Sequence, residues 1–254
     1  MILEARYRLF GLLLPLLLIA IWQAAAASPA FPTDTVSNPF AILSALTRLI
    51  ADGTIAMATL DTLISGGLGL VLGAALGGLA GLAVGLWYSA ERLTSGIVEF
   101  LRPVPAVALL PLALLLFGFG SLMEISVVAF AVFWPVMIIM RGAIRNIDPQ
   151  ILEVATALEF RPFDRLVKFL LPSVQREIFV ALKIGIGVAF VVAVTVEIVV
   201  NPRGLGYQLV LAQVGLKPDK VFAFLFWVGL VGWSVSAFLD FIEKRLFSWH
   251  QMER

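Results

Sequence analysis

One carboxylate is a candidate functional group. Glu197 is the one acidic residue well inside an apolar stretch of this sequence, and it lies close to the end of that stretch. A carboxylate in such surroundings is costly, which makes it a functional candidate by default. Two roles remain open. Glu197 hydrogen-bonds backbone near the Asn201–Gly206 turn, or it lines the exit of a solute path. Asp61 and Glu124 lie nearer the ends of apolar stretches, and we expect them to be solvated.

Few other residues suit catalysis or metal binding. The chain has no cysteine and one histidine, His250 in the C-terminal tail, so a thiolate or histidine metal site is not expected. A phosphate-binding P-loop ends in Gly-Lys-Ser/Thr, and no Gly-Lys dipeptide occurs. We therefore expect a chain that is not itself an enzyme and holds no cofactor or metal. Its energy would come from an ATP-hydrolysing partner or an ion gradient. The net charge of +1 gives no reason to expect nucleic acid as a partner.

The composition sets the fold class. The 254 residues are 61% hydrophobic and 14% charged, with a mean hydropathy of +1.01. A water-soluble domain carries about 25% charged residues. The chain must therefore be embedded in a lipid bilayer, where every backbone amide needs a hydrogen-bond partner within the protein. Long apolar stretches without strand-like alternation favour helices over a barrel.

We predict an all-α membrane protein with about six transmembrane helices, forming a single domain over 1–254. The expected spans are 9–27, 60–87, 105–120, 123–142, 178–200 and 221–246. The first is read as an uncleaved span, although it resembles a secretory signal. With the N-terminus in the cytoplasm, 14 of the 18 Lys and Arg residues fall inside, and the outer segments hold only Arg48, Arg203, Lys217 and Lys220. This asymmetry predicts that both termini and the 143–177 segment are cytoplasmic.

The longest outer connection is 28–59. Its first part is turn-rich, and Phe40, Leu43, Leu46, Thr47 and Ile50 then recur at helical spacing before Gly53. The pattern predicts an amphipathic helix. It lies along the outer membrane surface, or it is a connector that packs on the bundle.

Glycines recur every four residues in the second span, at Gly69, Gly73, Gly77, Gly81 and Gly85. This spacing puts five glycines on one helix face, where another helix can approach backbone to backbone. The partner is a helix of the same chain or of a second copy.

Prolines interrupt the middle of the chain. Pro103, Pro105 and Pro111 stand at the start of the third span, and Pro135 lies inside the fourth. Each removes a backbone hydrogen bond, and broken helices at membrane depth are tolerated where they line a cavity. We therefore expect the third span, with Pro111, to contribute to an interior path. Trp134 in the fourth span either packs in the bundle or faces that path.

The 143–177 segment is unusually charged for this chain. Asp148 is a good N-cap and Pro149 a good first helical residue, so a short helix should follow. Pro162 should begin a second helix, in which Phe163 and Leu166 share one side. The segment is either a docking element for another subunit or an amphipathic hairpin resting on lipid headgroups.

The stretch EVATALEFRPFDRLVKFLLP at 153–172 resembles the cytoplasmic loop of ABC-importer permeases. That loop reads Glu-Ala-Ala, three residues, Gly, nine residues, Ile, one residue, Leu-Pro. Glu153, Ala155, Leu171 and Pro172 match at the correct spacing, whereas Glu159 stands where glycine is usual. The flanks FLRPVPAVALLPLALLLFGFG and VEIVVNPRGLGYQL resemble the nitrate, sulfonate and taurine branch in particular.

The resemblance implies a type I importer-like permease fold with a two-helix cytoplasmic coupling loop. The expected contacts with an ATPase are Glu153, Ala155, Leu158, Glu159, Phe160, Phe163 and Asp164. Glutamate at position 159 puts the local turn in doubt, because only glycine accepts positive φ without cost.

The partners implied are cytoplasmic ABC ATPases that bind ATP and Mg, an extracytoplasmic solute-binding protein and a second permease copy, giving a homodimer in a bacterial inner membrane. The solute would be a small organic or inorganic anion such as a sulfonate, taurine or nitrate. The alternative is a gradient-driven secondary transporter or channel, which would show inverted repeats and paired intramembrane charges.

Overall fold

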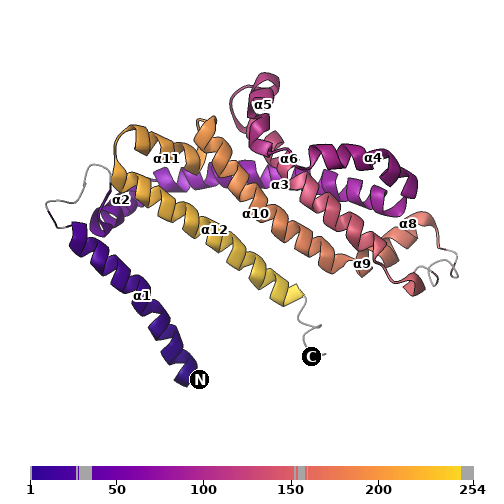
Figure 1. The fold of residues 1–254 in the computed structure, drawn as a ribbon, viewed down its shortest axis with the longest axis horizontal. Coiled ribbons are helices and arrows are strands. Elements are labelled where there is room, and N and C mark those ends of the chain that lie inside the picture. Colours follow the sequence, from indigo (N-terminus) through magenta and orange to yellow (C-terminus); the bar gives the residue numbers. More distant parts are fainter. Residues whose placement is uncertain are drawn as a thin grey trace.

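The computed structural model describes residues 2–26, 28, 36–151, 153, 158 and 160–246, and every regular element in them is helical (Figure 1). The predicted all-helical fold is confirmed. The elements are α1 (Ile2–Ala26), α2 (Pro39–Ala51), α3 (Thr54–Leu86), α4 (Tyr88–Leu101), the 3-10 turn η1 (Ala106–Leu109), α5 (Leu110–Phe117), α6 (Ser121–Arg145), α8 (Pro162–Arg165), the π-helical turn η2 (Leu166–Leu170), α9 (Leu171–Ser173), α10 (Gln175–Val199), α11 (Gly204–Val214) and α12 (Pro218–Leu246).

Four segments of the described chain are long and apolar enough to cross a membrane: α3, α6, the run Gln175–Val214, and α12 over Pro218–Arg245. A fifth span forms if α4 and the η1–α5 segment are counted together as a pair bent by 87°. The predicted first span falls in α1, whose part Leu13–Ala26 counts as a shorter apolar helix.

The expected third span over 105–120 contains η1 and α5, which together reach only from Ala106 to Phe117. The chain ends α4 at Leu101, breaks, and restarts as a 3-10 turn at Ala106 before α5. Pro103 and Pro105 explain the break, because neither supplies a backbone N–H and each restricts the residue before it. A span at this point therefore requires α4 together with the η1–α5 segment, and the two are bent by 87°.

The centre of the bundle is the contact between α3 and α6. All five glycines of the four-residue repeat face α6 of the same chain. A Cβ placed at Gly73, Gly77 or Gly81 would lie 2.5, 2.5 or 2.4 Å from a backbone carbonyl oxygen of α6. The two backbones are thus in direct contact over several turns, which only glycine permits. Of the two partners left open by the sequence, the structure places a helix of the same chain against these glycines.

The α2 helix packs on the bundle with one side and exposes the other, so it has features of both arrangements predicted for it. Ala45, Leu46 and Leu49 are buried in a core shared with α3, α11 and α12. Phe40 and Leu43 remain exposed on the opposite side. The helix ends before Gly53, whose φ of +78° is the left-handed conformation that favours glycine. At this corner hydrogen bonds from Thr54 lower the pKa of Asp52.

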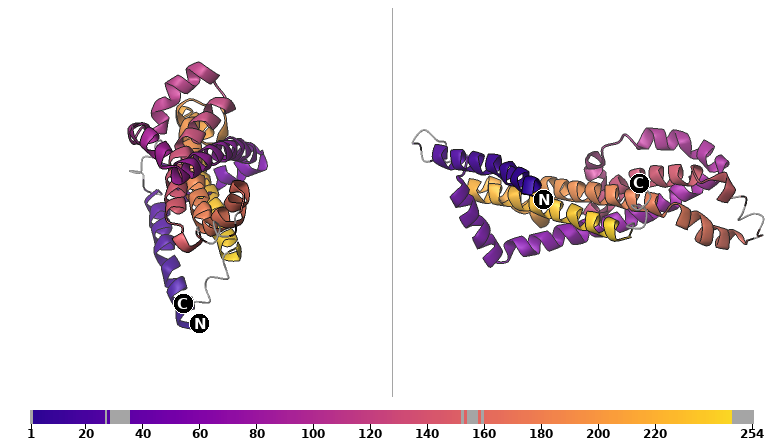
Figure 2. Two further views of the ribbon diagram at one scale, coloured as in Figure 1. Left: turned by 90° about the vertical axis from the view of Figure 1, so that its right-hand side faces the viewer. Right: turned by 90° about the horizontal axis from the view of Figure 1, so that it is seen from below.

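The bundle is elongated. The α2 and α11 helices lie at one end of it, and α8 and α9 lie at the other (Figure 1). The α1 helix touches the rest near α2, where Trp22 packs edge-on against Phe222 with ring centroids 5.8 Å apart. From there α1 diverges from α12 toward the N-terminus (Figures 1 and 2). Most described side chains of α1 are consequently exposed and available to lipid or to another protein.

Candidate functional site

The segment predicted to couple to a cytoplasmic partner stands on a firmly packed base. Leu170 and Val174 are buried together with Ala143, Ile144 and Ile147 at the end of α6. The partly buried residues around them include Leu82, Ile151, Leu166, Phe169 and Ile178, contributed by α3 and α10 as well as the loop. Side chains from three spans therefore fix the base of this segment.

The start of the segment agrees with its sequence. Asp148 Oδ1 accepts a hydrogen bond from the backbone N–H of Gln150 at 2.9 Å, as expected of an N-cap. The second helix begins at Pro162 as predicted and runs through α8, η2 and α9 to Ser173. A π-helical turn inserts one extra residue per turn, and such turns frequently mark functional sites.

The outer part of the segment exposes apolar side chains, as the coupling hypothesis requires. Phe163 is 74% exposed and Leu158 59% exposed. We call Leu158, Phe160 and Phe163 the tip. Phe160 is half-buried, because its ring packs on Phe169 with centroids 5.0 Å apart.

Some charged residues of the segment are paired and others are exposed. Asp164 pairs with Lys168 at 2.8 Å, and the Lys168 ammonium lies 5.6 Å from the centre of the Phe160 ring. Glu153 is exposed. Ala155 and Glu159, both expected at the ATPase contact, lie outside the described residues, so the turn that replaces the usual glycine stays a prediction.

An ion-pair cluster fastens the start of α4 to the C-terminal end of α6. Both Arg141 and Arg145 donate to the Glu91 carboxylate, one to each oxygen. Glu91 lies in the first turn of α4 and Arg145 in the last turn of α6, positions at which the helix dipoles favour these charges. The sequence gives no signal for this cluster, because nothing in the spacing of Glu91 and the two arginines places α4 beside α6.

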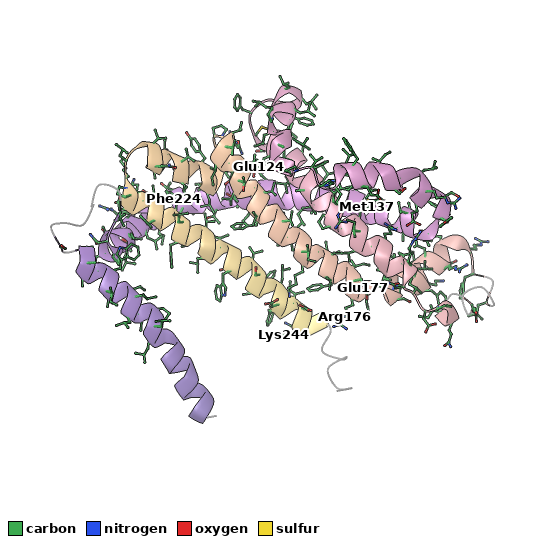
Figure 3. The ribbon with its side chains drawn as sticks, in the orientation of Figure 1. Glu124, Met137, Arg176, Glu177, Phe224 and Lys244 are labelled. Atoms are coloured by element: carbon green, nitrogen blue, oxygen red, sulfur yellow. The ribbon has the colours of Figure 1, made fainter. Side chains whose placement is uncertain are left out.

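The expectation for Glu124 was wrong. Its side chain is 1% exposed, and Glu197 is 2% exposed. Glu124 lies in the first turn of α6 (Figure 3). Its carboxylate accepts a hydrogen bond from Asn201 Nδ2. The error arose because Glu124 lies near a span boundary in the sequence, whereas Asn201, which follows α10, bonds to it in the fold. The described part of the chain therefore contains two buried acids.

Glu197, near the end of α10, is hydrogen-bonded to the first turn of α11. Its Oε2 accepts the backbone N–H of Gly206 at 2.8 Å, and Leu205 N donates to Thr62 Oγ1 at 3.0 Å. These bonds satisfy free N–H groups at a helix start. A Cβ at Gly204, where φ is +88°, would lie 2.0 Å from Glu197 Oε1. Of the two roles left open by the sequence, this geometry favours the structural one.

Two cavities lie along the inner half of the bundle. The first, about 500 Å³, is bordered by the break between α4 and η1, by α6 and by α10, and its lining includes Trp134, Pro135 and Val188. The second, about 720 Å³, lies between α4 and the inner ends of α3 and α6. Arg102 and Ile138 line both.

The residues expected on a solute path are thus dispersed. Trp134 lines the first cavity, Pro111 sits exposed in the first turn of α5, and Glu197 is buried against α11. Arg102 was counted only as a cytoplasmic charge. Its position just before Pro103, inside a long apolar run, was the available signal. No group of three or more His, Asp or Glu within the described chain could hold a metal ion.

Comparison with known proteins agrees with this architecture. The family model described as "Binding-protein-dependent transport system inner membrane component" matches residues 69–248. The putative aliphatic sulfonates transport permease protein SsuC of Bacillus subtilis is 30% identical over 94% of this chain and 87% of its own length. The nitrate import permease protein NrtB of Leptolyngbya laminosa is 31% identical over 69% of this chain and 62% of its own. The taurine transport system permease protein TauC of Escherichia coli is 29% identical over 67% and 62%.

Solved structures share the fold. An amino acid ABC transporter chain superposes with a TM-score of 0.64 at 19% identity, covering 79% of this chain and 97% of that one. A chain of the inward-facing MetNI methionine ABC transporter gives 0.61 at 18%, covering 82% and 96%. The helical membrane architecture, the cytoplasmic segment and the family match over most of the chain lead to one conclusion: this protein belongs to the binding-protein-dependent transport system inner membrane components, the permease subunits of ABC importers.

Proposed function

We propose that this chain forms the membrane path for a small anion and receives the force for transport from a separate ATPase through the tip. The anion is a sulfonate, taurine or nitrate, or a solute of similar size and charge. Three relatives whose names specify aliphatic sulfonates, taurine and nitrate support this substrate class. The family membership supports the import function itself.

The observation that carries the coupling role is an apolar tip on a rigid base. Phe163 and Leu158 expose large apolar surfaces at the end of the bundle that the charge asymmetry places in the cytoplasm. The base is fixed by Leu170 and Val174 within the helix ends. A protein partner that covers the tip would therefore transmit its movement to the spans rather than deform a loop.

The complete transporter would then hold two copies of this chain, two ATPase subunits with ATP and Mg, and an external solute-binding protein, with both termini of this chain in the cytoplasm. ATP binding would favour one of two states of the path, because the closed ATPases hold the two tips differently from the open ones. Alternating access follows from that difference in affinity. This chain would supply no catalytic residue.

A pull-down with a matched pair of variants tests the coupling. The tagged chain is extracted in mild detergent with a non-hydrolysable ATP analogue, and co-purifying proteins are identified. We expect a stoichiometric ABC ATPase with the wild type and with Phe163→Leu, which keeps the tip apolar. Phe163→Asp should remain in the membrane at normal abundance and lose the ATPase. Retention of the ATPase by Phe163→Asp, or purification of the wild type without one in several detergents, would refute the proposal.

The gradient-driven alternative requires acids that face the path. Two buried acids are present, but Glu124 is bonded to Asn201 and Glu197 to Gly206. Both therefore hold the α10–α11 corner together, and no observation in the described chain favours this alternative.

A further inference from the structure

Arg102 occupies an unusual position for an unpaired charge. It is the C-cap of α4, at the break before Pro103, and its side chain lines both inner cavities. On α6, Ile138, the eighteenth of the 25 residues of that helix, lines both cavities, whereas Trp134 lines only the smaller and Arg141 only the larger one. The exposed side chain of Arg102 thus borders the inner half of α6.

No counter-ion compensates this charge. Among the described residues Arg102 takes part in no ion pair, whereas Arg141 and Arg145 share Glu91. Glu99, one helical turn earlier, lines the larger cavity but not the smaller one. Arg102 is the one charged residue among those described that line the 500 Å³ cavity. An unpaired arginine beside apolar spans is expensive unless it meets water or an anion.

Trp134 lines the same cavity with its ring, while its Nε1–H is buried in the wall and has no acceptor in the described part of the chain. Arg102 is therefore the group in this cavity that can donate hydrogen bonds to an anion. The other walls are apolar and include Ile184, Val188 and Val192.

We propose that Arg102 is an anion-binding residue of the translocation path and holds the oxygen atoms of a sulfonate or nitrate group, with the apolar walls accepting any short alkyl part. A guanidinium donates two parallel hydrogen bonds to such a group, and the low polarity of the cavity strengthens the attraction. Because Arg102 lines both cavities, it would receive the anion from the first and release it toward the cytoplasm through the second. This inference rests on the proposed import of an anion.

A thiol probe tests the site without relying on transport. The chain has no cysteine, so Val188→Cys introduces a unique thiol in the wall of the 500 Å³ cavity. The complete transporter carrying it is treated with 2-sulfonatoethyl methanethiosulfonate, itself an alkanesulfonate, and with the cationic trimethylammonium analogue. With Arg102 present, the anionic reagent should react relatively faster, and added ethanesulfonate should slow it. Arg102→Gln should lower the anionic-to-cationic rate ratio about tenfold or more.

Matched variants separate charge from structure. Arg102→Lys should keep most of the preference, since the charge remains. Arg92→Gln removes an arginine that lines only the larger cavity, where its guanidinium stacks on Tyr88, and should leave the ratio near that of Val188→Cys alone. A ratio that is the same with Arg102 and with Gln at this position would overturn the inference. The inference would also be overturned if the preference for the anionic reagent appeared only after lipid removal and added ethanesulfonate did not slow the reaction. Arg102 would then hold a lipid phosphate.

Uptake by the reconstituted transporter distinguishes the two proposals. In an otherwise wild-type chain, Arg102→Gln should lower ATP-driven uptake of a labelled alkanesulfonate or taurine about tenfold or more, while the loaded binding protein still stimulates ATP hydrolysis. Normal uptake by this variant overturns the role of Arg102 and leaves the import function standing. No uptake of any small anion by the wild type, together with an Arg102-dependent reagent preference, overturns the substrate class but not the anion site.

Discussion

The substitution Gly77→Ala tests the backbone contact between α3 and α6. A Cβ at Gly77 would lie 2.5 Å from the carbonyl oxygen of Phe133 and 3.2 Å from its carbonyl carbon and Cα. All three atoms belong to the backbone, so no side-chain rotation can relieve the clash. Restoring an ordinary contact of 3.4 Å would move the helices apart by about 0.9 Å (3.4 minus 2.5) at this point.

The neighbouring glycine provides a matched control. A Cβ at Gly78 meets nothing within 4 Å. Alanine increases the intrinsic helix preference of both sites by about the same amount, near 1 kcal/mol in water, so this gain cancels when the two variants are compared. The difference in free energy of unfolding between Gly77→Ala and Gly78→Ala then reports the forced separation. Overpacking of this kind costs about 1–3 kcal/mol.

Thermal unfolding of the full-length chain in mild detergent gives the measurement. Each kcal/mol corresponds to a shift in Tm of about 2–4 °C for a chain of roughly this size. We therefore expect Gly77→Ala to melt several degrees below Gly78→Ala, and Gly81→Ala, where the clash is with Met137, to behave like Gly77→Ala. Equal melting of Gly77→Ala and Gly78→Ala would refute the contact.

Two further regions allow similar tests. Glu197→Ala should lower the free energy of unfolding by about 1–3 kcal/mol, because the buried Gly206 N–H loses its acceptor, and equal thermal unfolding of variant and wild type would contradict this. Gly204→Ala should be at least as damaging alone, and a double-mutant cycle with Glu197→Ala should show that the two costs are not additive, since the carboxylate is the group that the new Cβ meets. Glu91→Gln should loosen α4 at a cost below about 2 kcal/mol, reduced by the partial exposure of both arginines, whereas Glu99→Gln, which breaks no ion pair, should change little. Proteolysis within α4 would compare the last pair, and equal cleavage rates would show that the cluster does not hold this helix.

The sequence was most informative where a feature is local. The composition alone required lipid-embedded helices, and Asp148 with Pro162 correctly predicted where the short cytoplasmic helices begin. The glycine repeat correctly required a close backbone partner. Its spacing describes only one of the two surfaces, however, so the identity of α6 as that partner had to come from the structure.

Features that join distant segments could not be read in the same way. Glu124 and Asn201 are 77 residues apart, and Glu91 is 50 residues from Arg141. The prolines predicted a break before the third span, but not that α4 would meet the η1–α5 segment at an angle of 87°. Without that geometry, Arg102 appeared to be an ordinary cytoplasmic charge. For Glu124 and Glu91, the partners come from distant parts of the chain, which the local sequence does not reveal.

The α6 helix links the functional regions. Its inner end anchors the coupling segment through Ala143, Ile144 and Ile147, and its middle forms a cavity wall through Trp134. Backbone contact with the α3 glycines makes the two helices one rigid unit, so a force on the tip cannot bend α6 independently of α3. The cavity wall opposite α6 is formed by the end of α4 and the start of the η1–α5 segment, which are separated by the break beside Arg102. None of the α3 glycines that contact α6 contacts this wall. Relative movement within the chain should therefore concentrate at the cavity between α6 and this break, where the unpaired guanidinium lies.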